Sequence, residues 1–372
     1  MSDLPNTPQT MHSTQADTTA LAEDANGCAV HDCAIIGAGI AGSYLAAKLS
    51  ALGYHCAVYD KSRGSGGRAS SKRLPEGGSC DQGAPFFELE HPALACEKSR
   101  LMAADVIRPL TAGDELFTAI PKMSALTRFW LAPQEGQGDI SFYTSMRIHH
   151  IRRWMGVWHL LDEKYQTVGK ATQLVITAPA SQAAMLLTSP HVPSSMLLKA
   201  HRASRACLPQ WVMRFNAELD ADGISIDCDH DVIERLVCDG IKPERGHNKN
   251  CWVAHTRPEW SILNTDTAPE QVAETIEVAV RDLFPATSTF TASAPHRWLL
   301  GRHKPQLLAD VDAQSKAEMA DVLNDSEAPD CCWDADSALG LAGDWLSSGD
   351  IQGAMLSALR LSQIMYPDSG QN

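Results

Sequence analysis

Three glycines at a fixed spacing are the first residues that could do chemistry. Gly37, Gly39 and Gly42 form the pattern GAGIAG between a short apolar segment and a stretch with helical apolar spacing. Here Gly37 permits a tight turn, Gly39 lets the backbone approach a pyrophosphate, and Gly42 lets helix and strand pack closely. The helix N-terminus at Ile40 and Ala41 supplies an anion site. The pattern predicts nucleotide binding, although glycine-rich turns also arise for structural reasons alone.

A second group of residues extends this site. Asp60 stands 18 residues after Gly42, at the end of another apolar segment, where its carboxylate can accept hydrogen bonds from an adenosine ribose. Gly66 and Gly67 permit a second close backbone approach, and Arg68 can neutralise a diphosphate. The first glycine pattern does not separate NAD from FAD, so these residues must make that distinction.

Basic residues gather in this second group. Residues 61–73 begin with Lys61 and carry five basic side chains and no acid, in a chain of 372 residues with a formal net charge of −14. An ordinary basic loop would share this composition, but the position after Asp60 favours an anionic ligand. The acidic balance of the whole chain argues against a nucleic-acid partner.

The elements that must position these residues form a βαβ unit. Residues 32–36 and 55–60 have the apolar pattern of strands, and the helical spacing between them ends at Gly53. The remaining segments with a clear pattern are residues 145–161, 171–180 and 339–343, which predict strands, and 353–365, which predicts a helix.

Composition limits the class of protein. A content of 44% hydrophobic residues over this length predicts roughly two domains with a cleft between them. No apolar run is long enough for a membrane span and the N-terminus lacks a signal-peptide pattern, so we expect a soluble, cytoplasmic protein without a membrane partner. The 11 cysteines include no CxxC pair, so we predict neither a disulfide framework nor a metal site.

Seven short blocks, in order, resemble the renalase-like branch of the flavin-containing amine oxidase superfamily. The resemblance covers about residues 32–360 and implies one FAD. It also implies an α/β fold: a Rossmann-like FAD-binding domain of glutathione-reductase type, with an interleaved α+β substrate domain built on a mixed or antiparallel sheet. The blocks are GAGIAG at 37–42, YDKSRGSGGRASSKR at 59–73, DQGAPFF at 81–87, PKMSAL at 121–126, APASQA at 178–183, PHRW at 295–298, and LAGDW at 341–345 with QGA at 352–354.

The resemblance assigns further FAD contacts. Ala84 and Pro85 would lie near the flavin face, and Ile148 would contact the adenine through its backbone. Bacterial members usually read DHGAQYF where this chain has DQGAPFF. Because Gln82 and Pro85 depart from that pattern, the resemblance does not determine the identity of the substrate.

The last block also has a mechanical interpretation. Gly343 and Asp344 at a strand end can offer a carboxylate to ribityl or ribose hydroxyls, although alone they fit an ordinary turn. A helix beginning near Gln352, Gly353 and Ala354 would direct its positive end at the flavin ring.

The resemblance implies a renalase-type reaction. Dihydronicotinamide isomers of NAD(P) would be oxidised to NAD(P)+, and O2 would reoxidise the flavin and give hydrogen peroxide. One alternative is a flavin-containing amine oxidase acting on a small amine, for which Lys304 is the nearest lysine by position. A second alternative is a non-catalytic flavin-binding protein that responds to redox state.

Residues 251–258 supply the predicted substrate side. The segment resembles a strand of animal renalases with an active-site histidine, which makes His255 the match; a histidine bonded within its own sheet is the alternative. We also predict roles for Trp252 and Arg257 there, and secondarily for Arg297 and Trp298.

The predicted domain division is discontinuous. Residues 1–29 form a disordered tail. Residues 30–95, 144–188 and 337–368 form the FAD-binding domain, and residues 96–143 and 189–336 form the substrate domain. Within the latter, the acidic stretch 310–336 is predicted to be a solvated surface excursion.

Overall fold

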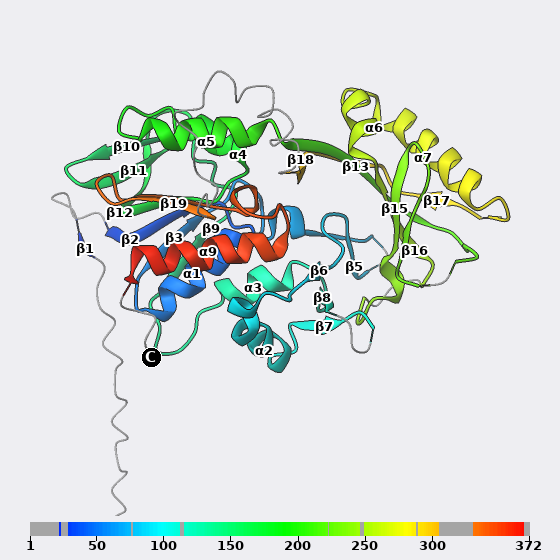
Figure 1. The fold of residues 1–372 in the computed structure, drawn as a ribbon, viewed down its shortest axis with the longest axis horizontal. Helices are drawn as coiled ribbons and strands as arrows, with labels where there is room; N and C mark the ends of the chain where they lie inside the picture. The colour runs from blue at the N-terminus through cyan, green and yellow to red at the C-terminus, as the bar shows by residue number, and fades with distance from the viewer. Residues whose placement is uncertain are drawn as a thin grey trace, which may run out of the picture.

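The computed structural model describes residues 22–23, 29–75, 77–111, 115–221, 223–245, 249–287, 289–304 and 330–367. Most of the predicted tail and of the predicted acidic stretch lies outside the described residues. Residues 330–336 of the acidic stretch are described, and the prediction of a surface excursion is wrong for them, because they include a strand, Cys331–Asp334, whose Cys331 is fully buried. Two sheets organise the rest, one of nine strands and one of six (Figure 1). No helix in the described part could span a membrane, since the longest have 15 residues and a span needs about 20.

The βαβ unit predicted from the glycine pattern is present. Strand β2 (Ala29–Ile36) leads into helix α1 (Ile40–Ala51), and β3 (Cys56–Tyr59) returns parallel to β2. The apolar run of β2 serves both faces of the sheet, because Ile35 faces one buried cluster and Ile36 the other. A continuous apolar strand therefore places its carboxyl end, where the glycine turn begins, inside the molecule.

Strands from distant parts of the chain complete the large sheet. Its order is β10-β11-β12-β2-β3-β9, with β20 beside the second half of β12 and β19 beside β20. The pairs of β9 with β3, β3 with β2, β2 with β12 and β12 with β20 are parallel. The strands added here are β1 (Ala22–Glu23), β9 (Ile140–Tyr143), β10 (His150–Trp154), β11 (Val157–Leu161), β12 (Thr167–Ile176), β19 (Cys331–Asp334) and β20 (Leu339–Ala342).

Helices cover both faces of this sheet (Figure 1). α1, α3 (Ala125–Leu131) and α9 (Ile351–Met365) pack on one face, and α4 (Ala180–Leu186) and α5 (Ser194–Ser204) pack on the other. Below α1 lie α2 (Ala95–Ala103) and a small sheet of β6 (Phe87–Glu88), β7 (Ile107–Pro109) and β8 (Leu116–Ala119).

The predicted domain boundaries need correction at three places. We assigned residues 96–143, which include β9, and also α5 and β19 to the substrate domain, but β9 and β19 pair within the large sheet and α5 packs on one of its faces. Trp130 of α3 and Phe117 of β8 are buried in the core beneath α1. The reason is that strand pairing and helix packing join residues far apart in sequence, so local composition does not mark these boundaries.

The second sheet is antiparallel, one of the two arrangements, mixed or antiparallel, that were predicted for the substrate domain. Helix α7 presents Val272, Ile276, Ala279 and Val280, spaced at helical intervals, to one face of it. The other face is turned toward the glycine-bearing part of the molecule. Its elements are β13 (Cys207–Asn216), β14 (Ser225–Asp227), β15 (Ile233–Cys238), β16 (Cys251–Thr256), β17 (Thr291–Ala292), β18 (His296–His303), α6 (Pro258–Leu263) and α7 (Pro269–Leu283).

Candidate functional site

One large cavity lies between the two sheets. Its volume is about 1410 Å³, and its wall draws on the β2–α1 turn, the loop after β3, the segment after β5 (Ser79–Asp81), strand β18 and the start of α9. A pocket for one drug-sized ligand measures roughly 300–1,000 Å³. The cavity therefore has room for a dinucleotide and a second small molecule.

The glycine turn after β2 has the geometry its spacing predicted. Gly37 has a φ of +116°, and a Cβ on Gly42 would lie 1.9 Å from the Gly37 carbonyl oxygen. No protein atom lies within 4 Å of the place where a Gly39 Cβ would stand. Gly37 and Gly42 are thus needed by the fold, whereas the open side of Gly39 leaves its backbone accessible to a ligand.

Asp60 holds the loops around it. Its Oδ2 accepts a hydrogen bond from the backbone N–H of Ala38 at 2.8 Å, and its Oδ1 accepts one from Ser62 at 2.7 Å. The neighbouring Lys61 also lines the cavity, and burial together with the positive charge of Arg147 lowers its pKa against the attraction of Asp60. Asp60 therefore ties the end of β3 to the glycine turn on the cavity wall.

The second glycine pair packs directly on the first turn. Gly66 has a φ of +120° and donates its N–H to the carbonyl of Ala38 at 2.8 Å. Gly67 has a φ of +52°, and a Cβ there would lie 3.5 Å from the Gly39 Cα. The two segments therefore present their backbones side by side to the same end of the cavity.

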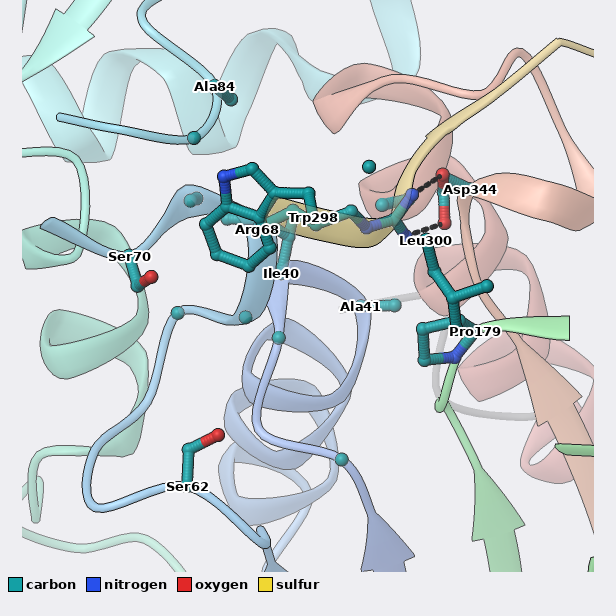
Figure 2. A pocket seen from close by; sticks show the side chains of 18 of the residues that line it. Ile40, Ala41, Ser62, Arg68, Ser70, Ala84, Pro179, Trp298, Leu300 and Asp344 are labelled. Atoms are coloured by element: carbon teal, nitrogen blue, oxygen red, sulfur yellow. Dashed lines mark hydrogen bonds and ion pairs between the residues drawn. The ribbon is translucent and has the colours of Figure 1, made fainter. Parts of the chain in front are cut away.

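Arg68 and Asp344 form a two-pronged ion pair at the cavity wall (Figure 2). Nη1 donates to Oδ2 at 2.8 Å and Nη2 to Oδ1 at 2.5 Å, and the side chains are 29% and 8% exposed. Burial by itself would lower the pKa of Arg68, but the charge of Asp344 and its hydrogen bonds outweigh burial and raise it. We predicted these residues to act on a diphosphate and a ribityl chain separately; their pairing was not predicted.

The last helix begins two residues earlier than predicted. Asp350 caps α9, and its Oδ1 accepts the N–H of Gly353 at 2.7 Å. Gln352 Oε1 accepts the N–H groups of Glu90 and His91 at 2.7 and 2.8 Å. A Cβ on Gly353 would lie 2.3 Å from Ser348 Oγ, so Gly353 serves the turn before the helix. This helix start is fastened to the segment after β6.

Nearly all of the predicted FAD contacts meet at this cavity. Gly42 and Gly353 stand behind the wall, where they permit close packing. The predicted residues that line the wall are Gly37, Gly39, Ile40, Ala41, Asp60, Lys61, Gly66, Gly67, Arg68, Ala84, Pro85, Ile148, Gly343, Asp344, Gln352 and Ala354.

The register of the second sheet brings polar side chains to the opposite wall. His255 of β16 pairs with Arg235 of β15 and with Val212 of β13, and Gln210 of β13 pairs with Trp298 of β18. Apart from Val212, these residues line the cavity. Side chains two apart on a strand share a face, so β13 and β16 turn these groups toward the first wall.

His255 is a buried, neutral imidazole at this wall. Its side chain is 3% exposed, and its Nε2 has no hydrogen-bond partner among the described residues. Burial, followed by the positive charges of Arg302, Arg235 and Lys242, lowers its pKa to about 3. An imidazole in this state can donate or accept one hydrogen bond to a ligand but carries no charge at neutral pH.

Two predicted substrate-side residues lie away from the cavity. Trp252 is buried in the core under α7, because its odd separation from His255 places it on the other face of β16. Arg257 donates to the carbonyls of His230 and Cys228 at the start of α6. The structure therefore removes both from the candidate site.

The secondary predictions Arg297 and Trp298 do reach the cavity wall. Arg297 also stacks over Trp211, while Trp298 Nε1 donates to the backbone carbonyl of Gln82 at 2.8 Å. Gln210 and Arg235 were not predicted, since only strand pairing reveals which face they occupy; their polar character within apolar strands was the available signal.

A buried ionic cluster supports the wall from behind. Lys242 Nζ lies 3.2 Å from Asp81 Oδ2 and 2.8 Å from Asp239 Oδ1, and Arg245 Nη2 lies 2.6 Å from Asp81 Oδ2. All four side chains are fully buried. Lys242 also donates to the carbonyl of Pro85 at 2.7 Å, so the cluster fixes the segment predicted to face the flavin.

Comparison with known proteins identifies the fold. A model of the NAD(P)-binding Rossmann-like domain matches residues 35–95. A proposed protoporphyrinogen oxidase from Exiguobacterium sp. 255-15 is similar in structure, with a TM-score of 0.54, 11% identity and coverage of 92% of this chain and 100% of that one. Putrescine oxidase bound to putrescine has a TM-score of 0.55, 12% identity and coverage of 91% and 99%. The predicted fold class is confirmed.

Proposed function

We propose that this chain is an FAD-dependent oxidoreductase of renalase type. It would oxidise dihydronicotinamide isomers of NAD(P) to NAD(P)+ and pass the electrons to O2, giving hydrogen peroxide. One observation carries the proposal: glycine-bearing segments at the two ends of the described chain line a single cavity of about 1410 Å³. The more specific part of the proposal, the renalase branch, rests on the order of the sequence motifs.

Each part of the dinucleotide has residues suited to it. Asp60 and Ile148 would hold the adenosine, and the backbone of Gly39 with the N-terminus of α1 and Arg68 would hold the diphosphate. Asp344 would bind ribityl hydroxyls. FAD supplies the hydride acceptor; the chain contributes orientation and electrostatics.

The opposite wall suits a donor that is already electron-rich. Dihydronicotinamides give up hydride without a general base, so the protein needs to orient the ring rather than take a proton from it. His255 fits that task, since its pKa near 3 keeps it neutral and its Nε2 has no partner among the described residues. Trp298 adds an aromatic surface on the same wall.

An amine oxidase is the second candidate. The structural likeness to putrescine oxidase is the observation in its favour. Amine oxidases typically place a lysine near the flavin, and Lys304 was our nearest candidate. Lys304 lines the cavity, but its Nζ lies 3.3 Å from Glu259 Oε1 and its side chain is 33% exposed. The contact with Glu259 holds the Lys304 ammonium group toward the surface and away from the place where an amine oxidase needs it. This favours the dihydronicotinamide reaction.

Stopped-flow reduction decides between the candidates. The purified protein is mixed without oxygen with dihydronicotinamide isomers in one series and with a panel of small amines in another. Loss of flavin absorbance near about 450 nm with the isomers alone supports the proposal. Bleaching by amines alone assigns the second candidate. A flavin that neither series reduces leaves a non-catalytic flavin-binding protein, and a colourless protein that takes up no FAD refutes the cofactor assignment.

A further inference from the structure

Three buried nitrogen atoms on the cavity wall have no hydrogen-bond partner among the described residues. They are Nε2 of Gln82, Nε2 of His255 and Nε2 of His303. Buried polar groups are nearly always satisfied, so unsatisfied ones on residues that line a cavity point to a ligand. His303 is the one that no motif and no resemblance singled out.

The position of His303 is fixed on one side of its ring. It is the last residue of β18, is 5% exposed, and pairs across the sheet with Cys207 of β13. Its Nδ1 lies 3.8 Å from the Cys207 sulfur. This contact occupies Nδ1 and leaves Nε2, on the other side of the ring, as the nitrogen that a ligand bound beside His303 could reach; His303 itself lines the cavity.

The surroundings of His303 indicate which part of a ligand it would meet. Burial lowers its pKa, which keeps the ring neutral, and the opposing charges of Asp344 and Arg68 also act on that pKa. His303, Arg68 and Asp344 all line the same cavity. Arg68 and Asp344 are the residues assigned above to the diphosphate and the ribityl chain. A neutral imidazole can donate to a phosphate oxygen or exchange a hydrogen bond with a hydroxyl in either tautomer.

We propose that His303 is a cofactor-binding residue whose Nε2 hydrogen-bonds the diphosphate–ribityl segment of the bound dinucleotide beside Arg68 and Asp344. The inference rests on the proposed FAD binding and adds a contact from the substrate-side sheet. Strand β18 then joins the two walls through the cofactor itself. Cys207 acts as a positioning residue that holds the imidazole ring.

The affinity of the apoprotein for FAD tests this contact. Loss of one buried hydrogen bond weakens binding by about 10-fold. We therefore expect His303→Leu to raise the Kd for FAD by about 10-fold, measured by flavin fluorescence titration. His303→Gln, whose amide can reach the position of Nε2, should stay within about 3-fold of wild type, whereas His303→Asn, whose amide reaches only the position of Nδ1, should match the leucine variant.

A second buried histidine provides the control. His31 of β2 is 7% exposed and its Nδ1 also has no partner among the described residues, but it does not line the cavity. His31→Leu should change thermal stability without changing the Kd for FAD. If His303→Leu does not fold, the asparagine and glutamine variants still give the comparison.

The outcomes separate this inference from the proposed function. A wild-type protein that binds FAD together with an unchanged Kd in His303→Leu and His303→Asn overturns the role of His303 and leaves FAD binding intact. An equal loss in His31→Leu also overturns it, because the effect would then be general to buried histidines. A wild-type protein that takes up no FAD overturns both.

Discussion

The imidazole of His255 makes stability depend on pH in a defined direction. Its folded pKa of about 3 lies below the usual value near 6.5, so between these values the unfolded chain binds a proton that the folded chain does not. Stability must fall as the pH drops through this window. Relative to His255→Leu, we expect wild type to lose about 2 kcal/mol of unfolding free energy between about pH 7 and pH 5.

Urea unfolding at several pH values measures this difference. The leucine variant lacks the titrating imidazole but keeps every carboxylate and every other histidine. The difference in unfolding free energy between the two proteins therefore reports the titration of His255. Parallel pH profiles for the two proteins would show that His255 gains a proton while folded.

The Arg68–Asp344 pair combines a structural and a ligand-binding role. Arg68→Ala leaves the carboxylate of Asp344, 8% exposed, without its two-pronged partner. We expect a loss of about 2 kcal/mol, discounted because Arg68 is 29% exposed, and weaker uptake of FAD. Arg68→Met combined with Asp344→Asn removes both charges. It should recover most of the stability but not the affinity, as urea unfolding and FAD titration would show; equal recovery of both would contradict the ligand role.

The resemblance to a renalase strand pointed to His255, whereas the role given to Trp252 on the same strand was misplaced. Both were assigned to one substrate-facing strand, yet an odd separation on a strand puts two side chains on opposite faces. Once His255 is taken to face the cavity, the alternation assigns Trp252 to the core. The position of Trp252 could therefore have been predicted from the sequence. The surroundings of His303 could not, because they depend on which strands pair.

At the scale of elements, the turn between β2 and α1 separates two kinds of glycine. A Cβ on Gly42 would meet the Gly37 oxygen at 1.9 Å, whereas Gly39 has open space and a φ of −75° that alanine adopts freely. Gly42→Ala should cost about 3 kcal/mol or more through overpacking. Gly39→Ala should stay within about 0.5 kcal/mol of wild type but weaken FAD uptake, because the added methyl occupies the ligand's side of the turn.

Thermal unfolding and FAD titration of the two variants test this separation. A Gly39→Ala protein that binds FAD as tightly as wild type would remove the turn from the cofactor site. A stable Gly42→Ala protein would mean that α1 can shift away from β2.

Elements with a strong local pattern were predicted, and those defined by their partners were not. The apolar runs of β2 and β3 and the β-branched run of β12 are visible in sequence. β9 and β19 have four residues each and join the large sheet only through pairing with β3 and β20. Their position in the sheet depends on tertiary contacts with strands far away in the chain, so no short segment of sequence predicts it.

At the scale of the whole molecule, charges that sequence analysis did not connect join the second sheet to β5, a short strand that belongs to neither of the two large sheets and precedes the flavin-facing segment. Asp81 belongs to β5, while Lys242 and Arg245 follow β15, more than 160 residues later. Two acids and two bases balance within the buried cluster. Such pairing satisfies buried charges but gives no periodic signal, which is why the motif blocks around it were predicted and the cluster was not.

Removing one charge from this cluster should loosen the contact between the second sheet and β5. Lys242→Met leaves a buried negative charge in excess and removes the donor to Pro85, so we expect a loss of about 3 kcal/mol. Because the side chains are fully buried, added salt should hardly change this loss. Arg108→Ala is the matched control: it breaks the exposed pairs with Asp105 and Glu244, so it should cost far less stability than Lys242→Met, and less still in salt.

Urea unfolding of both variants at low and high salt measures this contrast. If Lys242→Met costs no more than Arg108→Ala, the cluster does not hold β5 against the second sheet, and the cavity wall at Pro85 must be fixed by packing alone. If instead the loss is large and independent of salt, the geometry of the flavin-facing segment depends on charges supplied by the opposite sheet. The cofactor site is then a property of both sheets together, and FAD uptake should weaken in Lys242→Met although Lys242 does not line the cavity.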